Sequence, residues 1–258
     1  DRTAISEPPA ISNISSPGPI LVLLRDITEW RRLEQYRRDF LGNVSHELKT
    51  PLAAIQAAAE TLQPMLASEP QAAAKFVQII LDNAERLSRL IQDMLQLGRI
   101  EAGEQTWHKE MVALSELIPA VERHQPRATQ KGLQLLLQPG TEPVFAWVDA
   151  DALTRILENL LDNAIKYTRQ GQITIRWWQA ERHAVVEVAD TGEGIAPEHL
   201  PRIFERFYRV DKGRSRDQGG SGLGLAIVKH LVQAMDGALE VQSEIGVGSR
   251  FTVRLPAA

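Results

Sequence analysis

One histidine lies in a sequence context that could support chemistry. His46 belongs to the run FLGNVSHELKTPL (40–52), two residues from both Val44 and Leu48. Successive helical residues are about 100° apart, so His46 points roughly 200° away from these apolar neighbours and is predicted to be exposed. An imidazole titrates close to neutral pH and can exchange protons or react there. An exposed histidine alone is usually an ordinary surface residue, and the carboxylate of Glu47 beside it changes this little.

A second segment combines groups that bind magnesium and phosphate. Asn159, Asn163 and Lys166 are spaced at i, i+4 and i+7, which places them on one face of a helix. Two neutral oxygen ligands and one ammonium group suit magnesium and phosphate together. The alternative is a plain solvated face, but asparagine is a poor choice for one. The opposite face is apolar, with Leu157, Leu160, Leu161 and Ile165.

Two glycine-containing loops could bring the backbone close to a ligand. The first, DTGEGI (190–195), follows an apolar strand, and its glycines would allow a flat ligand to approach next to a carboxylate. The second, GGSGLGL (219–225), leads into a helix, where free amide groups favour an anion. It is neither a Walker A loop nor a Rossmann fingerprint, because the required lysine and βαβ context are missing. Either loop alone could be an ordinary turn.

Two long helices must position His46. Apolar residues at steps of three and four predict a helix over about 29–63, and a strict heptad seam predicts another over about 71–101. The short turn between them makes an antiparallel hairpin, and Pro51 should bend or loosen the first helix because it cannot donate to the carbonyl of Glu47. Two apolar stripes then need a partner, which is either a second copy of the chain in a four-helix bundle or the rest of this chain. The seam residues are Phe76, Ile80, Asn83, Leu87, Leu90, Met94 and Leu97.

After a short linker, strands and helices are intermixed. Helical patterns cover about 114–124, 150–166 and 222–236, and strand-like runs cover 133–137, 144–148, 172–178, 183–189, 238–242 and 249–255. This order predicts an α/β domain with helices laid on a mixed sheet.

Composition narrows the classes of function. The 258 residues carry 29 Lys and Arg against 33 Asp and Glu, so the net charge of −4 argues against a nucleic-acid-coating or membrane-coating protein. The absence of cysteine excludes disulfides, thiol nucleophiles and cysteine-bound zinc. No apolar run is long enough to span a bilayer, so we expect no membrane contact by this segment. The chain begins at Asp1 without a methionine, and we expect it to be part of a longer protein.

Taken in order, these segments resemble the sensor histidine kinases of two-component systems over about residues 25–255. FLGNVSHELKTPL matches the H box of that family, and ENLLDNAIKYT matches its N box. DTGEGI, RIFERFYR and GGSGLGLAIVK match the first glycine box, the F box and the second glycine box. The leading LVLLRDITE is similar to the end of a PAS-type sensor domain. The residues within the motifs are similar to those of the phosphate-regulon subclass of sensor kinases.

The resemblance implies a fold and a phosphoacceptor. The fold would be a helical hairpin, forming a dimeric four-helix bundle, followed by a Bergerat-type α/β sandwich. His46 would receive the γ-phosphoryl group of ATP, and Glu47 would take the proton from its other ring nitrogen. Thr50 would position a water molecule that dephosphorylates the partner response regulator. The domains would be an N-terminal tail at 1–28, a dimerisation and phosphotransfer domain at 29–103, and a catalytic domain at 104–258.

The resemblance also implies the ATP and Mg²⁺ ligands. Asn163 would hold Mg²⁺ with the support of Asn159, Lys166 would lie near the phosphates, and Tyr167 would lie against the nucleotide. Asp190 would accept the exocyclic amine of adenine. The lid at 208–220 would cover the phosphates, anchored by Phe204 and Phe207. The remaining expected nucleotide-site residues lie in the two glycine boxes and are Gly192, Gly194, Ile195, Gly220, Gly222, Leu223, Gly224 and Leu225.

Two other classes of function stay open at this point. A dimeric scaffold could bind nucleotide without transferring phosphate, but His46, Glu47 and Asn163 are all intact. Another member of the same ATPase superfamily, such as a mismatch-repair ATPase or an anti-sigma serine kinase, lacks the H box and the hairpin. We therefore expect a cytoplasmic histidine kinase core that forms a homodimer and passes its phosphoryl group to a response regulator, with no nucleic-acid partner.

Overall fold

The computed structural model describes residues 26–65, 69–140, 142–210 and 221–258. Its contacts divide the chain into two units, residues 1–39 and 40–258. In the first unit, the Asp26 carboxylate accepts a hydrogen bond from the amide of Thr28 (2.8 Å) where helix α1 begins. The run at 20–24, interpreted above as PAS-like, lies outside the described residues. All that follows concerns residues 40–258.

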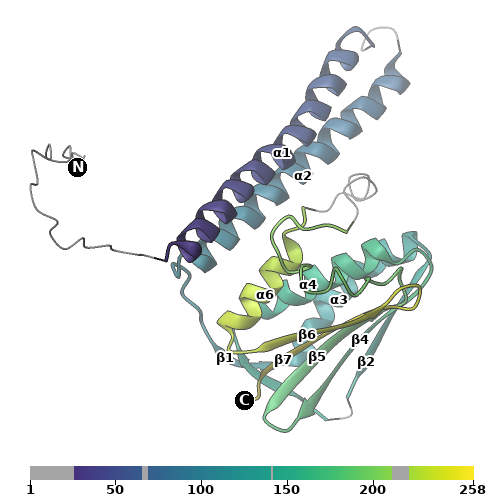
Figure 1. Ribbon diagram of the computed structural model, residues 1–258. Coiled ribbons are helices and arrows are strands. Elements are labelled where there is room, and N and C mark those ends of the chain that lie inside the picture. The colour runs from purple at the N-terminus through teal and green to yellow at the C-terminus, as the bar shows by residue number, and fades with distance from the viewer. Residues whose placement is uncertain (1–25, 66–68, 141, 211–220) are drawn as a thin grey trace, which may run out of the picture. The chain divides into compact units, whose positions relative to one another are not determined.

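Two long helices form the expected hairpin (Figure 1). Helix α1 spans Thr28–Met65 and helix α2 spans Pro70–Glu101. The α2 seam is buried at Leu90 and Leu97 and half-buried at its other positions, and both buried leucines belong to the hydrophobic core that continues into the rest of the chain. Helix α1 continues through Pro51. The apolar face of α1 is only partly buried, because the side chains of Leu41 and Leu52 on it are 55% and 47% exposed.

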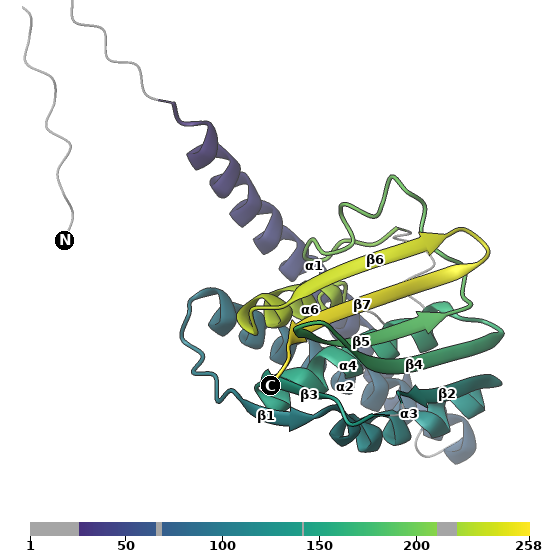
Figure 2. The ribbon, with the colours of Figure 1, turned by 90° about the horizontal axis from the view of Figure 1, so that it is seen from below.

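A five-stranded mixed sheet organises the rest of the chain (Figure 2). Its order is β2-β4-β5-β7-β6, in which only β2 and β4 are parallel. Helices α3, α4 and α6 cover one face. The strands are β2 (Leu133–Pro139), β4 (Gly171–Ala180), β5 (His183–Asp190), β6 (Ala238–Glu244) and β7 (Gly248–Pro256). The expected hairpin followed by an α/β sandwich is confirmed.

The core is formed by apolar residues that recur with the periodicity of strands and helices. On β4, Ile173, Ile175 and Trp177 point under the helices and are buried, while Trp178 points to the other face beneath the guanidinium of Arg176 (5.6 Å). Helix α4 (Ala150–Tyr167) is the central helix of the layer and contacts both α3 (Ile118–Gln130) and α6 (Gly224–Ala234). One face of α4 is apolar and fully buried, and the opposite, polar face is left uncovered. The fully buried side chains are Leu153, Ile156, Leu157, Leu160, Leu161 and Ile165.

The structure differs from the sequence expectation in two places. Strand β1 (Glu110–Ala113) was not expected, and it pairs antiparallel with β3 (Phe145–Val148) in a separate two-stranded sheet. The helix expected over 114–124 is a 3₁₀ turn (Leu114–Leu117) followed by α3, which continues through Pro126. Proline removes one amide donor, but the carbonyl four residues earlier belongs to the exposed Glu122, where water can replace that donor.

Among the residues that the structure describes, no helix has the length and apolar character needed to cross a membrane.

Candidate functional site

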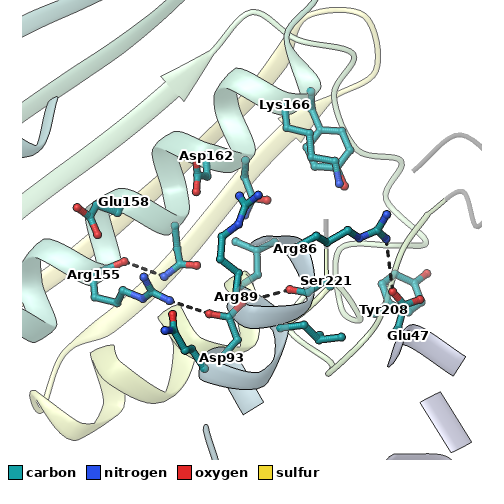
Figure 3. A pocket seen from close by; sticks show the side chains of 18 of the residues that line it. Glu47, Arg86, Arg89, Asp93, Arg155, Glu158, Asp162, Lys166, Tyr208 and Ser221 are labelled. Carbon is teal, nitrogen blue, oxygen red and sulfur yellow. Dashed lines mark hydrogen bonds and ion pairs between the residues drawn. The ribbon is translucent and has the colours of Figure 1, made fainter. Parts of the chain in front are cut away.

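The polar face of α4 lines a cavity of about 270 Å³ (Figure 3). Asn159, Asn163 and Lys166 all lie on this wall. The start of the helix is held by Asp149, whose carboxylate accepts a hydrogen bond from the amide of Ala152 (3.0 Å). The buried face of α4 fixes its rotation on the sheet, so the polar side chains can only point into the cavity.

A second cavity of about 130 Å³ adjoins the first. Its walls include Asp190, Gly194 and Ile195 from the first glycine loop, together with Phe251. The two cavities share a boundary of five residues, Asn163, Tyr167, Ile203, Tyr208 and Leu225. They therefore form one elongated site, with a largely apolar end at Asp190 and a charged end at Lys166.

Asp190 lies at the end of β5, opposite Ile173 of β4. Its Oδ1 atom accepts hydrogen bonds from the amides of Gly192 (2.8 Å) and Ser249 (3.3 Å). Burial raises the pKa of this carboxyl above its ordinary value, although the two amide donors oppose that shift. Both donors contact the same oxygen, so Oδ2 stays available to accept a hydrogen bond from a ligand amine.

At two glycines near Asp190, neighbouring protein atoms leave no room for a Cβ atom. Gly194 has a φ of +70°, and a Cβ atom there would lie 2.0 Å from the carbonyl oxygen of Glu244. A Cβ atom on Gly192 would lie 2.6 Å from the carbonyl oxygen of Tyr167 and 2.7 Å from the Asp190 carboxylate. Both positions therefore require glycine because the surrounding protein backbone comes close to them.

Lys166 is surrounded by several positively charged side chains. Burial lowers the pKa of its ammonium group to about 8, and the guanidinium groups of Arg209, Arg86 and Arg127 contribute further to the lowering. The ammonium nitrogen lies 4.7 Å from the centre of the Tyr167 ring. Because these cations repel one another, a polyanion in this cavity would stabilise all of them.

The two asparagines present neutral oxygen ligands beside this charge. Asn159 donates a hydrogen bond through Nδ2 to the carbonyl of Arg155 (2.8 Å), which fixes the orientation of its amide. Its Oδ1 atom lies beside Gly224, where a Cβ atom would come within 2.8 Å. Among the described residues, no group of three His, Asp or Glu side chains could hold a metal ion. Magnesium at Asn159 and Asn163 would thus need further oxygen ligands, such as phosphates and water.

The predicted phosphoacceptor and its neighbour face different ways. His46 is exposed and lines neither cavity, whereas Glu47 lines the first one. Consecutive helical residues diverge by about 100°, which accounts for this separation. Thr50 donates a hydrogen bond through its hydroxyl to the main-chain carbonyl of His46 (3.1 Å) and also lies outside both cavities.

Glu47 is held by two arginines. Its Oε2 atom lies 2.8 Å from Nη2 of Arg209, which is only 6% exposed, and 3.8 Å from Nη2 of Arg86 on α2. Arg209 is the last residue of the expected F box, so this ion pair links the catalytic part of the chain to the hairpin. The carboxylate that adjoins His46 is therefore in contact with the cavity wall in this conformation.

Several predicted nucleotide-site residues support the site without lining it. Leu223 is fully buried, and Phe204 packs against the core. Phe207 has a φ of +60° and donates its amide to the carbonyl of Gly222 (2.9 Å), which itself lines the first cavity. Gly224 also lines that cavity. Gly220 and the expected lid residues 211–220 lie outside the described residues.

Some lining residues were not expected from the sequence. Ile203 lines both cavities, and its position beside the F-box phenylalanines could have indicated it, while Tyr208, the first residue of the expected lid, also lines both. Helix α2 contributes one complete wall of the first cavity, with Arg86, Arg89, Leu90, Gln92 and Asp93. Only Leu90 of these belongs to the heptad seam.

Asp93 joins this α2 wall to the catalytic part of the chain (Figure 3). Its two carboxylate oxygens contact Nη2 of Arg155 (2.7 Å) and the hydroxyl of Ser221 (3.4 Å). Burial raises the pKa of the Asp93 carboxyl above its ordinary value, and the nearby Arg155 opposes this. Glu101, two turns further along α2, pairs with Arg206 and lies 3.3 Å from His230. None of these contacts has a signal in the sequence.

Comparisons with known proteins agree with this architecture. Residues 36–103 match the His Kinase A (phospho-acceptor) domain, and residues 148–258 match the histidine kinase-, DNA gyrase B- and HSP90-like ATPase family. The sensor protein SrrB of Staphylococcus aureus is 36% identical over 239 residues, which are 92% of this chain and 41% of SrrB. The chain thus spans about two fifths of the curated relatives it matches.

Two solved structures are similar to this chain, one over more than half of it and one over most of it. The mycobacterial sensor histidine kinase MprB is 32% identical, with a TM-score of 0.50 over 58% of this chain and 98% of that one. Full-length ShkA in complex with AMPPNP is 31% identical, with a TM-score of 0.65 over 85% of this chain and 46% of that one. The phospho-acceptor match distinguishes the chain from the gyrase-like and HSP90-like ATPases. The chain therefore belongs to the sensor histidine kinases.

Proposed function

We propose that this chain uses ATP to phosphorylate His46 and then passes the phosphoryl group to an aspartate of a response regulator. One observation carries this proposal. The elongated site includes Asp190 in one cavity and, in the adjoining cavity, Glu47 of the hairpin, the residue next to His46. An adenine at the Asp190 end would thus direct its phosphates toward the hairpin.

Adenine fits the Asp190 end by its hydrogen-bond polarity. The carboxylate has one oxygen occupied by two backbone amides and can accept the exocyclic amine of adenine with the other. Guanine has a carbonyl oxygen at the equivalent position and would be repelled. Gly194 and Ile195 line the same cavity as Asp190 and would lie beside the base.

The transfer step uses groups on both parts of the chain. A neutral ring nitrogen of His46 attacks the γ-phosphorus, the bond from that phosphorus to the bridging oxygen breaks, and ADP leaves. Glu47 takes the proton from the other ring nitrogen, so the phosphohistidine is neutral at the ring. Lys166 offsets the negative charge of the phosphates. His46 lies outside the cavity here, so the histidine that reacts either moves with the hairpin or comes from a second copy.

Magnesium fits the residues present. The oriented amide of Asn159 and the cavity-lining Asn163 offer oxygen ligands, which magnesium prefers, and ATP would supply the rest. When bound, the ion would neutralise phosphate charge. The protein residues that we assign to it are Asn163 and Asn159.

A response-regulator phosphatase activity is part of the proposal. Thr50 lies one helical turn from His46 on the same exposed face and keeps an oxygen that can bind water. Replacing it with alanine should abolish dephosphorylation of the regulator and leave labelling of His46 intact.

We also propose that the hairpin forms a homodimer. Its exposed apolar side chains would be covered in a four-helix bundle, and they are Leu41, Leu52, Val77, Ile79, Leu81, Ile91 and Leu95. Light scattering after size-exclusion chromatography should give twice the mass of one chain. A monomer would show that the apolar stripes have no second copy to bury them.

Labelling with γ-³²P-ATP and magnesium tests the central proposal. The wild type should acquire label that is lost in acid and retained in base, while His46→Gln should acquire none. His183→Gln is the matched control, because that histidine is exposed on β5 and lines neither cavity. Acid-stable label that persists in His46→Gln would mean a hydroxyl acceptor. ATP binding without any label would favour the non-catalytic scaffold.

A further inference from the structure

The first cavity has two walls, and the family motifs account for only one of them. The α4 wall contains Asn159, Asn163 and Lys166, while the facing wall is helix α2 of the hairpin. Two arginines lie on the α2 wall, Arg86 and Arg89. Their i, i+3 spacing places both on the same side of α2 (Figure 3).

The charges in this cavity are only partly balanced by ion pairs. Arg155 is paired with Asp93 (2.7 Å), and Arg127 is paired with Asp162. Within the part of the chain that the structure describes, Arg89 makes no hydrogen bond or ion pair with a side chain and stays exposed.

Arg86 has a long contact with a carboxylate that is already engaged. Glu47 lies 3.8 Å from Arg86 but 2.8 Å from the more deeply buried Arg209. Burial lowers the pKa of Arg86; the charge of Glu47 opposes this shift, while the positive charges of Arg209 and Arg89 add to it. On the opposite wall, burial and then the charges of Arg209 and Arg86 lower the pKa of Lys166. Both walls thus present positive charge to one space.

An anion between the walls would relieve this repulsion. The space adjoins the end of the site that holds the phosphates if adenine occupies the Asp190 end. Guanidinium groups bind phosphate oxygens through paired N–H donors, which an ammonium group cannot do. The terminal phosphate extends furthest from the adenine and would be the one within reach of α2.

We propose that Arg86 and Arg89 of the hairpin bind the terminal phosphate of ATP, so that α2 completes the nucleotide site and favours ATP over ADP in this docked conformation. This inference rests on the proposed ATP-dependent function. It assigns the hairpin a second role, in which α2 recognises the nucleotide while α1 carries the phosphoacceptor.

Nucleotide affinity in single variants tests this inference. Arg89→Ala is the primary variant, because it breaks no ion pair among the described residues. Its affinity for AMPPNP with magnesium, measured by titration calorimetry, should fall about tenfold, while its affinity for ADP should stay within about twofold. Arg86→Gln should behave in the same direction, and Arg89→Lys should recover part of the loss. Arg99→Ala is the matched control, an exposed arginine on α2 that lines neither cavity.

Two results would overturn the inference. AMPPNP affinity could be unchanged in Arg89→Ala and Arg86→Gln, with melting curves like the wild type. Alternatively, AMPPNP and ADP affinities could fall equally, in which case the arginines would support the whole site rather than the terminal phosphate. Failure of the proposed function looks different, because the wild type would then bind neither nucleotide or would leave His46 unlabelled.

Discussion

The affinity for nucleotide should fall as the pH rises above 8. Burial and the neighbouring guanidinium groups lower the pKa of Lys166 to about 8 in the free protein. Only the ammonium form attracts phosphate. A bound polyphosphate would raise the pKa of Lys166 toward its ordinary value of 10.5, so binding is linked to proton uptake at this side chain.

The expected size of the effect follows from that pKa. At pH 7 about nine tenths of the free protein carries the charged lysine, and at pH 9 only about one tenth does. If the pKa in the complex lies well above 9, the affinity for ADP should fall roughly tenfold between these two pH values. The full affinity is present below pH 8 and is lost as the pH rises from 8 toward the pKa of the complex.

Titration calorimetry with ADP and magnesium at pH 7, 8 and 9 measures this directly. Lys166→Arg keeps its charge throughout and should lose most of the pH dependence, and Lys166→Met should bind more weakly and retain only the part of the pH dependence that comes from other groups. His124 also lines the cavity, and its pKa is raised mainly by Asp162, so Lys166→Met separates its contribution. A flat wild-type profile, or an equal fall in Lys166→Arg, would refute the assignment.

Three further single substitutions have expected effects on nucleotide affinity or on stability. Asp190→Asn can keep its oxygen toward the amides of Gly192 and Ser249 but then presents an amine to adenine, so ATP affinity in competition binding should fall about 100-fold while GTP gains relative to ATP. Gly194→Ala forces a Cβ atom against the Glu244 carbonyl at a positive φ, so it should cost about 2 kcal/mol or more in chemical denaturation, and an unchanged midpoint would contradict the described backbone. Leu161→Ala empties a fully buried position and should cost about 2–5 kcal/mol in the same assay, whereas Leu95→Ala at an exposed position should cost far less.

Local patterns predicted most of the elements, because their periodicity reports directly on burial. The apolar side of α4 is an example, since Leu157, Leu160 and Leu161 have the spacing of one buried face and are buried. The heptad seam of α2 predicted the helix in the same way, and its buried members Leu90 and Leu97 join the core of the catalytic part, whose helix α6 contacts α2. Strand β1 is short and mixed in character, and its pairing with β3 depends on a segment more than thirty residues away.

The α2 wall of the site could not be predicted for a different reason. A heptad pattern marks the residues that face the partner helix but leaves the other faces equivalent. Arg86, Arg89 and Asp93 are ordinary polar residues of a solvated helix until the catalytic part of the chain is placed against them. The motifs likewise placed Leu223 with the nucleotide, and the structure buries its side chain in the core that supports the loop.

Pro51 has a mechanical consequence for the whole helix. It has no amide hydrogen, so the carbonyl of Glu47 loses its donor within α1, and the neighbouring carbonyl of His46 also accepts the Thr50 hydroxyl. The hydrogen-bond ladder is therefore interrupted in the turn that carries His46 and Glu47, which lowers the torsional stiffness of α1 there. A torque transmitted along α1 would concentrate its twist at this turn. Since adjacent residues differ by about 100°, a rotation of that size would exchange the carboxylate facing the α2 wall for the imidazole.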